Sequence, residues 1–179
     1  MATSKNLGDD YIKINHGTKE ILLFDALPTV EVLIQDNYPE LSWGITNETK
    51  NIAGYPCIKA TTNYRGRNWI AWFTPNIAIP YGPWKLHGLP GLILEAYDKD
   101  EIFTMRGLKV EQAKSELFNQ DFKKLKTTNN QKPITYKQFL EDRDEAMENM
   151  VKQMNDKGEN AELIIPPRTG YELKYEWEE

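Results

Sequence analysis

Residues 55–73 read YPCIKATTNYRGRNWIAWF, and this stretch decides the fold class. Apolar and polar side chains alternate in part of Tyr55–Thr62, and Trp69–Phe73 is a short apolar run rich in aromatic residues, and both patterns are typical of strands. Tyr64–Asn68 separates the two runs and contains a glycine suited to a tight turn. Parallel strands need a crossover of about a dozen residues or more, so these two strands are predicted to be antiparallel.

The same alternation recurs along most of the chain, with turn residues between the runs. It predicts a meander of short strands and leaves no room for crossover helices in the first third of the sequence. Ser115–Lys126 fits neither the strand nor the helix period and stays open. The remaining expected strands are Tyr11–Ile14, Ile21–Phe24, Val30–Ile34, Leu41–Ile45, Gly91–Tyr97, Glu101–Val110 and, after Pro166-Pro167, Tyr171–Trp177.

One long helix is expected over Tyr136–Lys157. Thr135 and Gln138 form a capping box, and Gly158 supplies a stop. Leu140, Met147, Val151 and Met154 share one face, which predicts packing against the sheet. The fold class is therefore mainly β with one long helix (α+β), built on a curved antiparallel sheet.

Composition sets bounds on size and on partners. The 179 residues, 40% of them hydrophobic, suit a single domain over residues 1–179. The net charge is -5, and residues 141–179 hold 12 acidic and 5 basic side chains. Lys123, Lys124 and Lys126 form the one tight basic cluster, which is too narrow for a nucleic-acid site. No run reaches the length of a membrane span, and the lone Cys57 is expected to be a small buried hydrophobe.

The stretch Gly82–Glu95 is the most unusual part of the sequence. It packs two prolines and three glycines among large apolar residues. Pro83 and Pro90 fix φ, whereas Gly88 and Gly91 allow positive φ or a close backbone approach. We expect a rigid buried bend that leads into a strand at Leu92.

Here the sequence resembles the GLPGLI family of Bacteroidetes proteins. The signature hexapeptide stands as Gly88, Leu89, Pro90, Gly91, Leu92 and Ile93. Other segments match that family's pattern in order, so that the resemblance covers roughly residues 40–110. These segments are Trp43 with Thr46–Lys50, Ile52–Cys57, Lys59–Thr61, Arg65–Arg67 and Ala71–Pro75.

The resemblance implies an exported or periplasmic protein of unknown function whose leader, absent from Met1–Lys5, has been removed. The family's short strands also look similar to half-barrel carriers of lipoproteins and lipids. The leading hypothesis is therefore a non-enzymatic envelope protein that binds a lipid-like or peptide ligand, or an outer-membrane partner protein. A structural accessory of an outer-membrane complex is a further alternative.

The ligand-binding candidates are large rings crowded into residues 43–84: Trp43, Tyr55, Trp69, Trp72 and Trp84. Ring faces on a concave sheet could cover an apolar ligand, although aromatic residues also fill ordinary cores. A different hypothesis is a hydrolase or isomerase that gathers His87, Glu95, Asp98 and Arg65. The sequence contains no complete catalytic motif, and neither a metal site nor a cofactor is expected.

Overall fold

The computed structural model describes residues 12–26, 31–111, 132–164, 168 and 170–178. These residues form two compact units, the first drawn from residues 1–38 and 114–165 and the second from residues 39–113 and 166–179. The prediction of a single domain over 1–179 is not tested by this division. Ser115–Lys126 lies outside the described residues, as does Pro166-Pro167.

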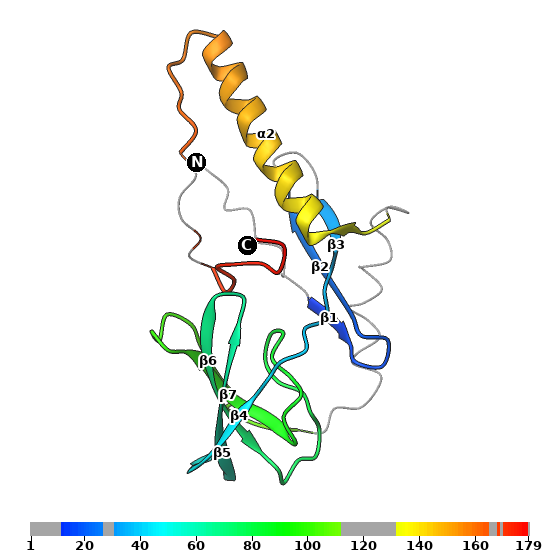
Figure 1. Cartoon of the computed structure of the whole chain (residues 1–179), viewed down its shortest axis with the longest axis vertical. Coiled ribbons are helices and arrows are strands. Elements are labelled where there is room, and N and C mark those ends of the chain that lie inside the picture. Colours follow the sequence, from blue (N-terminus) through cyan, green and yellow to red (C-terminus); the bar gives the residue numbers. More distant parts are fainter. Residues whose placement is uncertain (1–11, 27–30, 112–131, 165–167, 169, 179) are drawn as a thin grey trace. The chain divides into compact units, whose positions relative to one another are not determined.

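The first unit holds a four-stranded sheet and a helix (Figure 1). Its strands are β1 (Ile12–Asn15), β2 (Glu20–Ala26), β3 (Glu31–Asp36) and β9 (Ile134–Thr135). The first three strands form an antiparallel meander, and β9 pairs in parallel with β3. Ile21 and Ile34 are fully buried.

The helix α2 (Tyr136–Asp156) confirms the expected element almost to the residue. The Thr135 hydroxyl accepts a hydrogen bond from the backbone amide of Gln138 at 3.1 Å. Just beyond the C-terminal end of the helix, Gly158 has a φ of +85°. Packing differs from the prediction, because only Phe139 and Leu140 are buried. Met147, Val151 and Met154 are half-buried. The expected apolar stripe is thus buried only in the first turn, where α2 meets β3 and β9.

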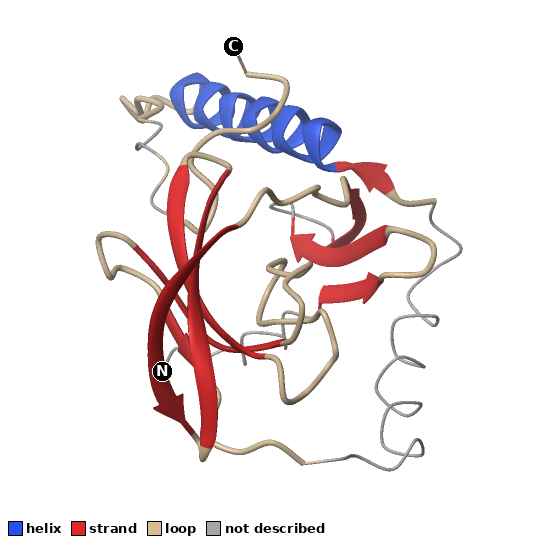
Figure 2. Cartoon of the chain, turned by 60° about the horizontal axis from the view of Figure 1, so that its bottom comes forward, coloured by secondary structure: helices blue, strands red, loops and turns tan. Residues whose placement is uncertain are grey.

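The second unit is a five-stranded antiparallel meander in the order β4-β5-β6-β7-β8. Its strands are β4 (Gly44–Ile52), β5 (Tyr55–Tyr64), β6 (Arg67–Thr74), β7 (Leu92–Asp98) and β8 (Thr104–Arg106). The long strands curve strongly without closing into a barrel (Figure 2). The mainly β class with one long helix is confirmed for the described residues, in two sheets instead of one.

Two tight turns set the register of the long strands. Ala53 and Gly54 both have positive φ between β4 and β5, as do Arg65 and Gly66 between β5 and β6. Two successive residues with positive φ are the mark of the hairpin turn that matches the twist of the strands. The hairpin predicted from residues 55–73 is therefore confirmed, with Tyr64 paired to Arg67.

Three expected strands are wrong in extent or kind. Of Leu41–Ile45 only Gly44 and Ile45 are in a strand, which continues to Ile52. Of Glu101–Val110 only Thr104–Arg106 is a strand, because Glu101 turns with φ +54°. Tyr171–Trp177 forms no strand. The amides of Leu173 and Lys174 both donate to the carbonyl of Arg65, which gives an anchored turn instead of a ladder.

The signature hexapeptide forms a partly buried bend, in which Gly88 and Pro90 are exposed. Gly88 has φ +90°, and Leu89, Ile93 and Leu94 are buried. Leu92 is only half-buried, contrary to expectation. A Cβ on Gly91 would lie 2.2 Å from the carbonyl oxygen of Thr74, so this position has no room for a side chain.

We expect Gly91→Ala to lower the free energy of unfolding by about 1–3 kcal/mol, because the β6 backbone must move to admit a methyl group. Urea unfolding followed by circular dichroism measures this. Gly170→Ala is the matched control, since a Cβ there meets no atom within 4 Å. Equal midpoints for both variants would contradict the close approach.

Candidate functional site

The five-stranded sheet packs its main core on one face, and the opposite face carries a smaller buried cluster beside exposed polar side chains. Trp69, Ala71 and Phe73 point from β6 into the main core, which Leu86 and Leu89 of the β6–β7 loop also enter. Lys59, Thr61 and Asn63 alternate with the core residues of β5 and lie on the opposite face. Both hollows described below open on this second face.

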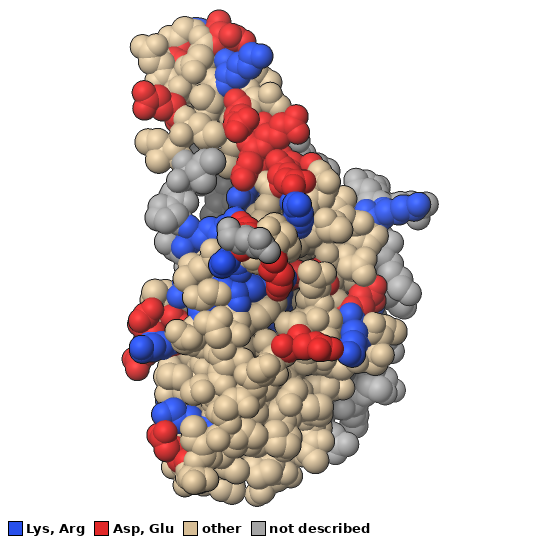
Figure 3. Space-filling view, in the orientation of Figure 1, with Lys and Arg blue, Asp and Glu red and all other residues tan. Residues whose placement is uncertain are grey.

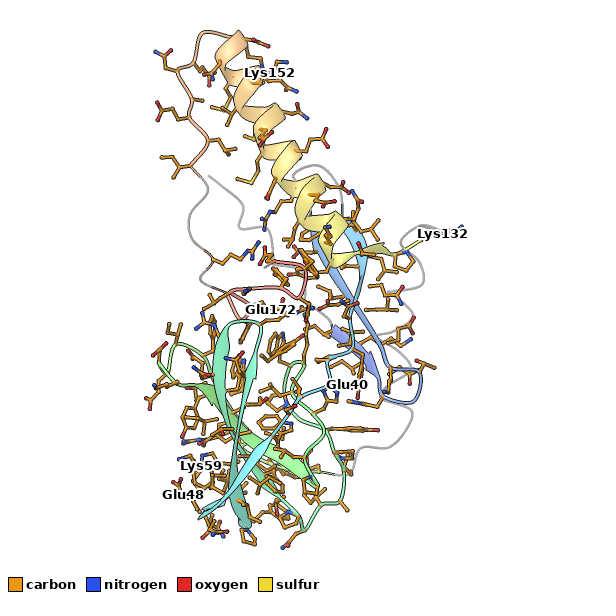
Figure 4. All side chains as sticks on the ribbon, in the orientation of Figure 1. Glu40, Glu48, Lys59, Lys132, Lys152 and Glu172 are labelled. Carbon is orange, nitrogen blue, oxygen red and sulfur yellow. The ribbon has the colours of Figure 1, made fainter. Side chains whose placement is uncertain are left out.

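The larger hollow has a volume of about 470 Å3 and is rich in hydrogen-bonding side chains. Its polar lining includes Lys59, Thr61, Asn63, Asn68 and Lys99. The Asn63 amide donates to the Asn68 carbonyl at 3.0 Å across the β5–β6 pair. The ammonium nitrogen of Lys59 lies 2.8 Å from a carboxylate oxygen of Glu48. Figure 4 shows the two residues side by side at the edge of the sheet. The hollow therefore offers amides, hydroxyls and ammonium groups beside an apolar part of its lining, which includes Ile70.

The smaller hollow, of about 290 Å3, lies beside a cluster of three charges. The buried carboxylate of Glu95 accepts from Lys50 through one oxygen and from Arg106 through the other. Lys50 also lies over the ring of Trp72, with its ammonium 4.3 Å from the ring centre. These contacts fix both cations at the rim of the hollow.

The environment of Glu95 keeps it ionised. Burial alone would raise its pKa, but the hydrogen bonds from Lys50 and Arg106 outweigh burial and hold the pKa below the ordinary value. A carboxylate with a lowered pKa is a poor proton donor near neutral pH. Glu95 is therefore suited to orient cations and not to act as a general acid.

The structure separates the five predicted ligand-binding rings. Trp43, Trp69 and Trp84 belong to the main core, whereas Tyr55 and Trp72 pack on the other side of the sheet with Cys57. Trp69 and Trp72 are three residues apart on one strand, so they face opposite ways. The rings do not form one concave apolar site; Trp69, Trp72 and Cys57 are buried.

The four residues of the hydrolase hypothesis also have separate surroundings. The ring of His87 is hydrogen-bonded to the carbonyl of Lys85 at 2.9 Å, and burial lowers its pKa. Asp98 pairs with Arg67 at 3.0 Å, and Glu95 pairs with Lys50 and Arg106. Arg65 is occupied by two glutamates of the C-terminal segment. These four residues therefore do not line one common cleft.

A second charge cluster, missed in the sequence, lies at the β5–β6 turn. Glu172 accepts from Arg65 at 2.5 Å and from Lys85 at 2.7 Å, and all three side chains are buried. Glu176 adds a contact to Arg65 at 2.9 Å. Figure 4 shows Glu172 at this end of the sheet. The acidic tail gave a hint of this cluster, but only the tertiary fold identifies the partners.

The described residues show neither a cluster of metal ligands nor a helix fit to span a membrane. No group of three or more His, Cys, Asp or Glu side chains among them is placed to hold a metal ion. None of their helices combines the length and apolarity that crossing a membrane requires.

Comparison with solved structures gives the class of the fold. The chain is similar to PNGF-II in the C2 space group, at 18% identity and a TM-score of 0.54, and to PNGF-II in the P21 space group, at 18% and 0.50. Each match covers 80% of this chain and 26% of the solved chain, so this chain spans about a quarter of that length. At this identity the likeness concerns the fold alone. No curated protein matches the chain.

The family follows from the sequence. Residues 28–138 match the family described as N-glycanase peptide, N-terminal domain, which is more than half of the chain. The chain belongs to this family. The assignment to the GLPGLI family, made on residues 40–110, is therefore wrong.

The function deduced from that assignment is corrected with it. A non-enzymatic envelope protein that binds an apolar ligand or partner conflicts with membership of a glycanase family, and the hydrolase alternative agrees better. The signature hexapeptide keeps its structural role as a partly buried bend. An exported or periplasmic location stays a prediction.

The charge cluster at the smaller hollow makes stability depend on pH. Because the pKa of Glu95 is lower in the folded state, its ion pairs stabilise the fold above the unfolded pKa of about 4.3, and this contribution is lost as the pH falls through the folded pKa. We expect Glu95→Gln to cost about 1–3 kcal/mol at pH 7 and progressively less below pH 4.

Urea unfolding of the parent and the variant at pH 7 and pH 3 tests this dependence. Glu48→Gln is the control, because its pair with Lys59 is exposed and should contribute little at either pH. A cost for Glu95→Gln that is the same at both pH values would show that the carboxylate charge does not matter.

Proposed function

We propose that this chain takes part in the hydrolysis of N-linked glycans, as the N-terminal domain of an N-glycanase. The proposal is supported by the match of residues 28–138 to that family and by the shared fold with PNGF-II. Since the chain spans about a quarter of the PNGF-II structures, the activity of a whole glycanase is itself part of the proposal.

Within such a hydrolase, the role of this chain is to contact the glycoprotein substrate. The buried carboxylates of Glu95, Asp98 and Glu172 are each ion-paired. Carboxylates held in this way have their oxygens engaged by cations of the fold, which suits a structural role. On the face of the β4–β8 sheet opposite the main core, in contrast, Thr61, Asn63 and Asn68 are exposed side chains outside both apolar clusters.

The larger hollow is the single observation that carries this role. Thr61, Asn63 and Asn68 present hydroxyl and amide groups, which both donate and accept hydrogen bonds. Sugar hydroxyl and acetamido groups have the same double capacity. Lys59 and Lys99 add donors at the same hollow of about 470 Å3, which is within the range of small-molecule sites.

The test is a calorimetric titration of the chain with a peptide bearing one neutral N-glycan and with the same peptide lacking the glycan. We expect only the glycopeptide to bind. Asn68→Ala should weaken it about five- to tenfold, the loss of one or two hydrogen bonds. Asn76→Ala is the control, because Asn76 is an exposed asparagine of the β6–β7 loop outside the hollow.

Equal binding of the two peptides, or equal loss in Asn68→Ala and Asn76→Ala, would overturn the proposal for this face. Mass spectrometry of the same mixtures measures glycan release. An intact glycopeptide after prolonged incubation is expected if the chain supplies substrate contacts and not the catalytic groups.

A further inference from the structure

We infer that the smaller hollow, beside Lys50, Glu95 and Arg106, is a binding site for the carboxylate of an acidic sugar. The two cations and one carboxylate leave a net charge of +1. The side chain of Glu95 is 3% exposed, whereas those of Lys50 and Arg106 are 33% and 60% exposed. The negative charge is thus beneath the surface, and the positive charges reach the rim of the hollow.

The cations keep hydrogen-bonding capacity for a ligand. Arg106 binds Glu95 through Nε, and no other residue of the described chain is bonded to its two terminal nitrogens. Lys50 uses one of its three ammonium protons on Glu95. The planar guanidinium matches the two oxygens of a carboxylate, so a ligand can bind without displacing Glu95.

The site is also held in place before any ligand arrives. Glu95 receives one cation on each oxygen, and Trp72, itself buried, lies beneath the Lys50 ammonium. Side chains fixed in this way lose less conformational entropy on binding. An ordinary pair of exposed cations on a surface lacks both supports.

The rest of the lining favours a sugar acid over a bare ion. Ile52, Ala53 and Leu108 give the hollow apolar walls, and Leu108 is 86% exposed. The side-chain oxygen of Asn51 accepts a hydrogen bond from the backbone amide of Gly54 at 3.1 Å. The NH2 group of the same side chain is then available to donate to a hydroxyl group of the sugar. A volume of about 290 Å3 is at the lower limit of ligand sites and suits one ring.

This inference rests on the proposed function only for the source of the sugar, an acidic residue of a glycan. Binding of a carboxylate depends on the hollow alone. Figure 3 shows few charged groups in the lower part of the face that it draws.

The experiment is an NMR titration of the 15N-labelled chain with three probes, namely glucuronate, glucose and inorganic phosphate. Glucuronate and glucose differ in the carboxylate, and phosphate supplies an anion without a sugar ring. We expect saturable shifts of the Arg106 Nε–H and Gly107 amide signals with glucuronate, weaker binding of phosphate and no response to glucose. Added sodium chloride should weaken glucuronate binding through screening.

Arg106→Gln should weaken glucuronate binding by at least about tenfold, because a charge-assisted bidentate contact is lost. Arg106→Lys should give a smaller loss, since it keeps the charge but not the planar fork. Lys137→Gln is the control, with the same change of charge on α2. Because Arg106 is 60% exposed, these variants are expected to fold, which circular dichroism checks.

Phosphate binding as tight as glucuronate would reduce the site to a general anion site and overturn the inference. Equal responses to glucose and glucuronate, or no response to any probe, would do the same. None of these results touches the neutral-glycopeptide titration at the larger hollow. Failure of the inference is therefore distinguishable from failure of the proposed function.

Discussion

The second unit depends on one close contact between two backbones. Gly91 lies against the carbonyl of Thr74, where no other residue has room, and the next amide, that of Leu92, donates to the carbonyl of Ile77 at 2.9 Å. This contact turns the chain back after a long loop and places β7 beside β6. Leu89 and Ile93 then enter the core on either side of the bend. The pairing of β7 with β6 completes the sheet, so both hollows depend on the contact at Gly91.

Local patterns predicted most of the elements because their causes are local. The short runs Tyr55–Thr62 and Trp69–Phe73 and the turn between them identified the central hairpin, and Thr135 with Gln138 identified the start of the helix. The pairing of β3 with β9 joins residues about a hundred positions apart, which no local pattern encodes. The segment Tyr171–Trp177 alternates like a strand, yet its contacts with Arg65 decide its shape.

The candidate site was harder to predict than the fold. Rings were chosen for their chemistry, but strand geometry sends Trp69 and Trp72 to opposite faces and buries both. Glu95 was chosen as a reactive carboxylate, whereas Lys50, 45 residues before it, makes it a fixed anion. The hexapeptide suggested a family, yet its residues specify a bend. A motif that solves a folding problem is weak evidence of function.

The ion pairs of Glu172 bear on where a working fragment of this protein can be cut. Similarity to the family ends at residue 138, and an expression boundary drawn there would look natural. Such a fragment would keep the buried Arg65 and Lys85 but lose the carboxylate that neutralises both. Removal of one partner of a buried ion pair costs several kcal/mol, which is comparable to the whole stability of a small domain. Truncation libraries should therefore retain the last fourteen or so residues, even though they lie outside the recognisable family sequence.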